Sequence, residues 1–137
     1  MKYVTYIIIF ALLLSVGLAV YVRVAPTDAA NWHVPVTADT SRDMTGGAIR
    51  VLSADETVLQ RVDAAARALP RTRVLAGSVE DGRITYVTRS RVIGFPDYTT
   101  VEYSNGLLRM HARLRFGRSD FGVNAERLQR LLAAAEG

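Results

Sequence analysis

Arginine is the residue type with the greatest capacity for chemistry in this chain, which contains sixteen arginines but a single lysine. A guanidinium presents a planar fork that binds a carboxylate or phosphate with two parallel hydrogen bonds. Several arginines stand near a bend that Gly117 and Gly122 bracket. We predict that this region binds an anion through the following residues: Arg89, Arg91, Arg113, Arg115, Arg118, Ser119, Asp120 and Asn124.

The polar residues of the bend also have a local explanation. Ser119-Asp120-Phe121-Gly122 fits a type I turn with glycine at its last position, and Asn124 is a typical helix N-cap. Asp97, Glu102 and Asp120 could each neutralise one arginine. In this alternative the arginines hold loops together and bind no ligand.

Acid–base catalysis is a second alternative. His111 is the one residue of the predicted domain that could act as a general base, with Asp97 or Asp120 beside it. No serine or second acid stands at a telling spacing from His111, so we predict no catalytic residues. Two histidines and no cysteines supply too few ligands for a metal site, and we predict no cofactor.

The amino-terminal segment predicts a membrane anchor. Val4 to Val22 contains no charged residue, and its length spans a hydrocarbon core of ~30 Å at 1.5 Å per residue. The apolar part of a cleaved signal peptide, the alternative, normally covers only about 7–15 residues. We therefore predict a transmembrane anchor over residues 1–24, which makes the membrane a partner of this chain.

The flanking charges predict the orientation of the anchor. Lys2 and the free amino terminus slightly outweigh Arg23 and Asp28, which favours an amino terminus inside the cell. We therefore predict a single-pass protein of the inner (plasma) membrane with a periplasmic carboxy-terminal domain. The net charge of +4 is too small to imply nucleic acid, which we do not expect as a partner.

Residues 25–48 read as a linker, because Pro26, Pro35 and Gly46-Gly47 interrupt any periodic pattern. Trp32 is the exception. It could lie at the membrane interface or strap the segment onto the domain, and stacking on a ligand is the alternative. His33 has no metal-ligand partner at a suitable spacing, so we interpret it as structural.

A helix and two hairpins follow the linker. Ser53 and Glu56 form a capping-box pattern that predicts a helix ending before Pro70. Asp81-Gly82 and Asn105-Gly106 each favour a type I′ turn between two strands. The hairpins are predicted over 73–90 and 98–116.

Each predicted turn implies a strand register. With Asn105-Gly106 at the tip, Glu102 opposes Arg109 and Val101 opposes Met110, which pairs acid with base and apolar with apolar. With Asp81-Gly82 at the tip, Glu80 opposes Arg83, Val79 opposes Ile84 and Gly77 opposes Tyr86.

The last strand is apolar on one face and basic on the other. Leu108, Met110 and Ala112 alternate with Arg109 and His111, and the pattern continues to Phe116. Asn124 is predicted to cap the final helix. The fold class is therefore α+β: after the anchor come a helix, a four-stranded antiparallel sheet of two hairpins and a carboxy-terminal helix, over residues 49–137.

Two segments resemble a family of bacterial and plastid proteins, domain of unknown function 1499. Phe95-Pro96-Asp97 is similar to its turn between hairpins, and Arg115 to Asn124 followed by Arg127 is similar to its carboxy-terminal pattern. The family tends to place hydroxyl residues just before that pattern, where this chain has Ala112 and Leu114. The resemblance implies a membrane- or envelope-associated domain but no established activity, substrate or cofactor.

These patterns together predict a membrane-anchored envelope domain that serves as a binding or scaffolding module. Its predicted ligand is anionic: a small molecule, a lipid headgroup or an acidic protein partner. Two alternatives stay open. One is an enzyme that uses His111, and the other is a structural subunit of an envelope complex in which the arginines are paired internally.

Overall fold

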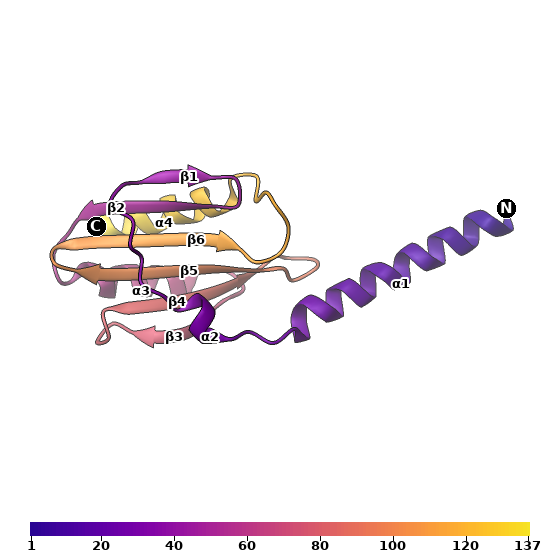
Figure 1. Ribbon diagram of the computed structural model, residues 1–137, viewed down its shortest axis with the longest axis horizontal. Coiled ribbons are helices and arrows are strands. Elements are labelled where there is room, and N and C mark those ends of the chain that lie inside the picture. Colours follow the sequence, from indigo (N-terminus) through magenta and orange to yellow (C-terminus); the bar gives the residue numbers. More distant parts are fainter.

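A six-stranded antiparallel sheet forms the centre of the computed structural model, which describes residues 1–137. Two helices cover one face of the sheet, and a long amino-terminal helix projects from one end (Figure 1). The strand order is β1-β2-β6-β5-β4-β3. The strands are β1 (Arg42–Met44), β2 (Gly47–Ser53), β3 (Thr72–Ser78), β4 (Arg83–Arg89), β5 (Pro96–Ser104) and β6 (Leu107–Leu114). The helices are α1 (Lys2–Val24), α2 (Ala29–Trp32), α3 (Val58–Ala68) and α4 (Val123–Glu136).

The α+β class is confirmed, but the prediction of four strands is wrong, because β1 and β2 add a third hairpin. Strand β2 pairs with β6 along its whole length, from Gly47 opposite Arg113 to Ser53 opposite Leu107. A Cβ atom on Gly47 would lie 2.4 Å from the carbonyl oxygen of Ala112. This glycine therefore allows two strands to approach closely, whereas its sequence context suggested a flexible linker.

The hairpin at Asn105-Gly106 is confirmed. Glu102 lies opposite Arg109 and Val101 opposite Met110, as the turn predicts. The backbone φ angles of Asn105 and Gly106 are 52° and 76°, the positive values that a type I′ turn requires. Local turn chemistry is sufficient to set the register of this strand pair.

The predicted register of the first hairpin is wrong. Gly77 lies opposite Ile84 instead of Tyr86, and a bulge between Val74 and Ala76 shifts the pairing further along the strands. Only Gly82 of the predicted Asp81-Gly82 pair has a positive φ, so a type I′ turn does not form. The bulge is a long-range adjustment that the turn residues alone do not encode.

The core lies between the sheet and the two covering helices. Apolar residues of α3 and α4, among them Leu59 and Leu128, pack on Met110 and Ile84 of the sheet. Helix α3 begins at Val58 with Thr57 as its N-cap, and the Asp55 carboxylate accepts a hydrogen bond from the Thr57 amide at 2.8 Å in the preceding turn. The predicted Ser53 cap is therefore wrong, since Ser53 ends strand β2.

The start of α4 also differs from the prediction. Gly122 is the N-cap, and Asn124 is a fully buried residue inside the helix. The φ angles of Phe121 and Gly122 are 52° and 81°, which excludes a type I turn over residues 119–122. The Asp120 carboxylate supports this turn by accepting hydrogen bonds from the amides of Gly122 at 3.0 Å and Asn124 at 3.1 Å.

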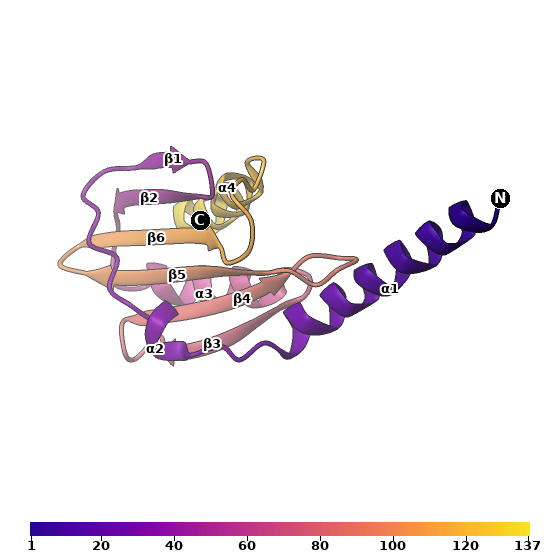
Figure 2. The same ribbon diagram turned by 45° about the vertical axis from the view of Figure 1, so that its right-hand side comes forward.

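Residues 25–40 lie along the sheet on the face opposite to α3 and α4 (Figures 1 and 2), and we call this segment the strap. The Trp32 ring stacks on Tyr98 with ring centroids 4.1 Å apart. The guanidinium of Arg113 donates a hydrogen bond to the Trp32 carbonyl oxygen, and that of Arg109 donates one to the Ala38 carbonyl oxygen at 3.1 Å. The basic face of β6 is therefore covered by the strap, and these two arginines hold it in place.

Helix α1 is long and apolar enough to cross a membrane, although a signal sequence would have the same properties. The helix extends away from the sheet, and its last turn touches the rest of the chain (Figures 1 and 2). Val22 is completely buried, and the Tyr21 ring packs edge-on against Phe116 with centroids 6.1 Å apart. The carboxy-terminal end of α1 therefore packs against the end of the sheet.

Candidate functional site

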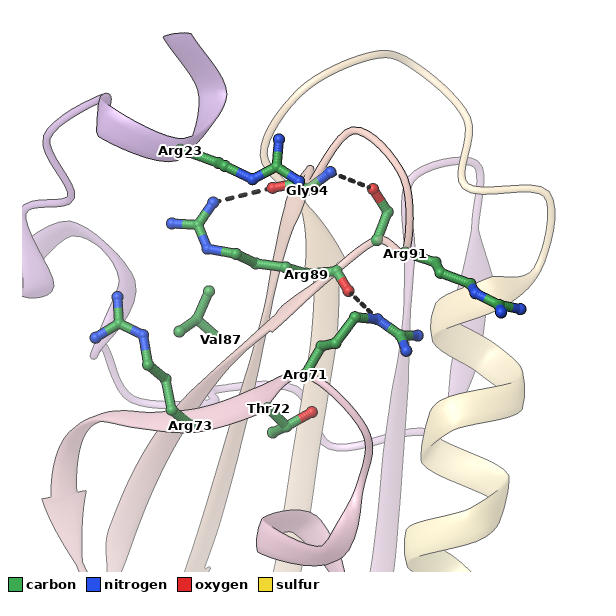
Figure 3. A pocket seen from close by; sticks show the side chains of 9 residues that line it. Arg23, Arg71, Thr72, Arg73, Val87, Arg89, Arg91 and Gly94 are labelled. Atoms are coloured by element: carbon green, nitrogen blue, oxygen red, sulfur yellow. Dashed lines mark hydrogen bonds between the residues drawn. The ribbon is translucent and has the colours of Figure 1, made fainter. Parts of the chain in front are cut away.

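Five arginines line a cavity of about 440 Å³ at the end of the sheet from which α1 departs (Figure 3). We call this cavity the arginine hollow. It has one hydrophobic lining residue, Val87, and no acidic one. Its arginines are Arg23, Arg71, Arg73, Arg89 and Arg91.

Three elements position these arginines. Arg23 belongs to the last turn of α1, Arg71 and Arg73 stand at the start of β3, and Arg89 and Arg91 stand at the end of β4. The Arg89 amide donates to the Arg71 carbonyl oxygen at 3.0 Å, and the Arg71 side chain donates back to the Arg89 carbonyl oxygen at 3.0 Å. Antiparallel pairing therefore brings together arginines eighteen positions apart in the sequence.

Backbone carbonyl groups also hold the guanidinium groups of Arg89 and Arg23. Arg89 donates to the carbonyl oxygens of Val22 at 3.0 Å and Gly94 at 2.9 Å, and Arg23 donates to that of Val92 at 3.0 Å. These bonds connect α1 to the loop between β4 and β5. They orient the guanidinium groups but leave their charge without a counter-ion.

The charge of the arginine hollow is uncompensated within the chain. Seven other arginines form ion pairs with aspartate or glutamate, and none of the five in the hollow does. Like charges gathered in one cavity repel each other, so an anion bound between them would relieve that repulsion. Guanidinium groups are well suited to bind the oxygens of a phosphate or carboxylate.

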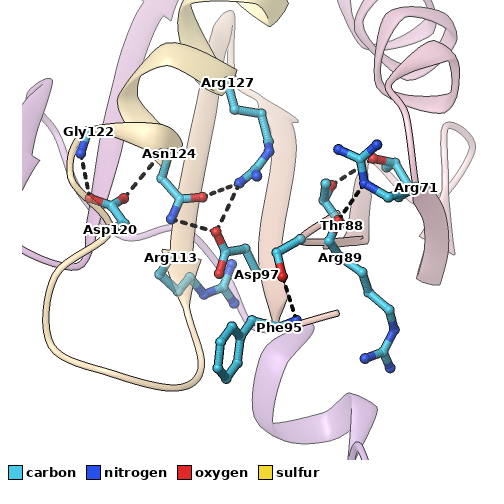
Figure 4. Close-up of polar contacts among 12 residues, drawn as sticks. Arg71, Thr88, Arg89, Phe95, Asp97, Arg113, Asp120, Gly122, Asn124 and Arg127 are labelled. Carbon is cyan, nitrogen blue, oxygen red and sulfur yellow. Dashed lines mark hydrogen bonds and ion pairs between the residues drawn. The ribbon is translucent and has the colours of Figure 1, made fainter. Parts of the chain in front are cut away.

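A second cavity, of about 380 Å³, lies beside the first and is lined partly by the Asp97 network, which consists of Asp97, Asp120, Asn124 and Arg127. The side-chain amide of Asn124 donates a hydrogen bond to the Asp97 carboxylate at 3.2 Å, and Arg127 forms an ion pair with the same carboxylate at 3.5 Å (Figure 4). Arg127 also donates to the Asn124 side-chain oxygen. Burial raises the pKa of Asp97, opposed by Arg127 and Asn124, and burial lowers the pKa of Arg127.

The Asp97 network connects the start of β5 to the first turns of α4. Asp97 and Arg127 are paired with each other, and the hydrogen bonds that Asp120 accepts from backbone amides fix the loop that precedes α4. A structural role accounts for all of these contacts. The polar residues of this network therefore carry less evidence for a ligand than the unpaired arginines do.

The predicted site residues separate into three places. Arg89 and Arg91 line the arginine hollow, whereas Arg113 and Arg115 donate hydrogen bonds to the strap, at Trp32 and Pro26. Ser119, Asp120 and Asn124 support the turn before α4, and Arg118 is an exposed residue of the same loop. The structure therefore does not bring the five predicted arginines into one cluster.

Arg23, Arg71 and Arg73 were missing from the predicted site. The sequence did contain a pattern that could have identified two of them, because Arg71 and Arg73 have the same two-residue spacing as Arg89 and Arg91. The predicted register placed Arg73 opposite Ser90, whereas it lies opposite Val87. With the register of the structure, the two arginine pairs converge at one end of the sheet.

His111 lies on the strap face of the sheet, away from both acids proposed as its partners. It lies two residues from each of Arg109 and Arg113, so it shares the sheet face on which these arginines bind the strap. Asp97 bonds with α4 on the other face. Burial, Arg113 and Arg42 lower the pKa of His111 to about 4. His111 has no acid beside it, so the arrangement offers no catalytic pair.

The lowered pKa of His111 predicts a pH-dependent stability. The folded pKa of about 4 lies below the ordinary 6.5, so the unfolded chain binds more protons between these values, and lowering the pH through this window reduces the free energy of unfolding. His111→Gln should flatten this dependence. Urea unfolding of the full chain in detergent, repeated across the window, measures it.

The matched control for this prediction is the other histidine. His33→Gln should retain the contribution of His111 to the pH dependence. An unchanged slope in His111→Gln would contradict the prediction, because the buried imidazole would then not be the group that titrates.

A protein-family model described as "Protein of unknown function (DUF1499)" matches residues 24–134. No curated protein matches the chain. The matched range contains the whole sheet, α3, nearly all of α4, the strap, the Asp97 network and four of the five arginines of the hollow.

Proposed function

Since the chain belongs to the DUF1499 family of unknown function, only its own side chains indicate a role, and we propose that it is a membrane-anchored module that binds anions in the arginine hollow. The chemical class of the ligand is a phosphate or carboxylate. The observation that carries the proposal is the group of five arginines without an acidic partner around one cavity.

The size and lining of the cavity support this ligand class. Small-molecule sites commonly enclose about 300–1,000 Å³, and the arginine hollow encloses about 440 Å³. Arg89 is held by backbone carbonyl groups, so less side-chain freedom is lost when it binds. Arg73 and Arg91 are exposed lining residues of the hollow, so their side chains are free to close on a ligand.

The proposed location follows from α1 and its flanking charges. We propose that α1 crosses the inner membrane with its amino terminus in the cytoplasm, which places the sheet and the arginine hollow in the periplasm. Lys2 and the amino terminus support this orientation. The last turn of α1 supplies Arg23 to the cavity, so the hollow would lie next to the membrane surface.

The proposal predicts that Arg73→Gln and Arg91→Gln each weaken anion binding about tenfold, since a hydrogen bond to a charged group contributes about 1.5–3 kcal/mol. Both side chains are exposed and form no ion pair, so neither substitution should disturb the fold. Isothermal titration calorimetry of the full chain in detergent, with inorganic pyrophosphate as the probe, measures the effect.

Arg42→Gln is the matched control, because Arg42 is also exposed and unpaired but lies in edge strand β1, outside the hollow. It should leave the affinity for pyrophosphate unchanged. Equal affinities of Arg73→Gln, Arg91→Gln and Arg42→Gln would contradict the proposed site.

A further inference from the structure

We infer that the arginine hollow binds the phosphate of an anionic phospholipid in the bilayer that holds α1, and that Val92 and Phe121 insert into this bilayer beside it. This inference rests on the proposed anion site and assigns the source of the anion. Its basis is the position of two loops relative to the end of α1: the loop of residues 90–95 and the loop of residues 115–122.

Both loops reach the level of the last turn of α1. Phe116 packs edge-on against Tyr21 at 6.1 Å, and Phe95 packs on Phe116 at 6.3 Å. Arg23 donates to the Val92 carbonyl oxygen at 3.0 Å. Tyrosine and arginine at the end of an apolar helix lie in the headgroup region of a bilayer. The two loops therefore meet the same region when α1 is in the membrane (Figure 2).

The loops expose the two most accessible large apolar side chains among residues 25–137. Phe121 is 95% exposed and Val92 is 78% exposed. Phe121 also has a φ angle of 52°, which is unusual for a bulky residue, and its neighbours are held there by the Asp120 carboxylate. The chain thus maintains a strained turn that presents an aromatic ring to its surroundings. A lipid interface is an environment in which such a ring is favoured.

The charges around the apolar residues complement an anionic membrane surface. Arg91 stands beside Val92, and Arg118 stands in the same loop as Phe121; both are exposed and unpaired. Arg23, at the end of α1, and Arg91 and Gly94 of the first loop all line the hollow. A lipid phosphate at headgroup level could therefore enter the hollow without leaving the membrane, and this arrangement favours a lipid over a free anion.

Spin labels on single cysteines test the insertion, and the chain has no native cysteine to interfere. Val92→Cys and Phe121→Cys place a label on the two loops, and Glu80→Cys places the control at the opposite end of the sheet, in the exposed β3–β4 turn. The full chain is reconstituted in vesicles of phosphatidylcholine mixed equally with phosphatidylglycerol. Labels at 92 and 121 should be accessible to dissolved oxygen and shielded from a water-soluble nickel complex, and the label at 80 should show the reverse.

Bound lipid identifies the source of the anion. The chain is extracted from the same vesicles with mild detergent, and the retained lipid is counted by mass spectrometry. Phosphatidylglycerol should be enriched over phosphatidylcholine, and Arg73→Gln and Arg91→Gln should each lower this enrichment about fivefold, as expected for one arginine at an anionic surface. The loop labels should keep their depth in both variants.

The outcomes separate this inference from the proposed function. If the labels at 92 and 121 are as accessible to nickel as the label at 80, or if phosphatidylglycerol is not enriched, the lipid assignment is overturned. Pyrophosphate binding in detergent would then still support the anion site. If pyrophosphate does not bind and phosphatidylglycerol is not enriched either, the anion site itself is overturned.

Discussion

Replacing Arg127 by methionine is expected to lower the free energy of unfolding by about 3–5 kcal/mol, the usual cost of breaking a buried ion pair from one side. The side chains of Arg127 and Asp97 are only 11% and 17% exposed. Without Arg127, the Asp97 carboxylate would stay in a poorly hydrated place with the Asn124 amide as its remaining side-chain partner. Urea unfolding of the full chain in detergent, followed by far-UV circular dichroism, measures the loss.

The pH dependence of this loss identifies its cause. Burial raises the pKa of Asp97 in the folded chain, and Arg127 opposes that rise, so its removal should raise the pKa further. A raised folded pKa means that ionised Asp97 costs stability above that pKa and that protonation restores stability as the pH falls through it. The loss caused by Arg127→Met should therefore shrink at acidic pH.

Arg130→Met is the matched control, since Arg130 lies one turn further along α4 and pairs with Glu126 in an exposed ion pair. Such pairs contribute about 0–1 kcal/mol. A loss for Arg127→Met no greater than that for Arg130→Met would show that the Asp97 network does not stabilise the fold.

Replacing Trp32 by alanine is expected to cost about 3 kcal/mol, at the lower end of the range for large aromatic truncations, because the ring is only partly buried. The ring stacks on Tyr98, and the Arg113 guanidinium lies 5.5 Å from its centroid. Its removal would uncover Tyr98 and the buried part of Arg113. Thermal unfolding in detergent, followed by far-UV circular dichroism, gives the loss.

Val34→Ala tests whether this effect is specific to the stacked ring, since Val34 belongs to the same strap but is exposed. It should change the melting temperature little. Limited trypsin digestion adds a local measurement, because Arg23 and Arg42 flank the strap. Faster cleavage in Val34→Ala than in Trp32→Ala would contradict the predicted role of the indole.

Local patterns were sufficient for part of the fold. Asn105-Gly106 has a strong preference for one turn type, and the alternation along β6 fixes which side chains face the helices. The β1–β2 hairpin and the β3–β4 register depend on contacts between distant residues. Position 47 must be glycine because a side chain there would collide with the carbonyl oxygen of Ala112 in β6. A Cβ atom on Gly77 would lie 2.1 Å from the Arg83 carbonyl oxygen and 2.6 Å from the His33 ring. A glycine has no side chain to reveal such a neighbour in the sequence.

Contacts between distant residues also limited the prediction of the candidate site. Arg89 and Arg91 were predicted, and Arg71 and Arg73 lie near them because β3 pairs with β4. Arg23 reaches them only because α1 packs against the sheet end. In the sequence, Arg113 and Arg115 have the same two-residue spacing as Arg89 and Arg91. What separates the two groups is the strap, whose path across the sheet follows from the Trp32–Tyr98 stack and not from any periodic pattern.

The burial of Val22 and the hydrogen bond from Arg89 to its carbonyl oxygen make helix α1 one wall of the arginine hollow. A fragment that lacks α1 would lose Arg23 and an acceptor that orients Arg89. With α1 in the bilayer as we propose, the tilt of α1 and the occupancy of the hollow are thermodynamically linked. A ligand that binds best at one tilt stabilises that tilt, and a membrane thickness that changes the tilt changes the affinity for the ligand.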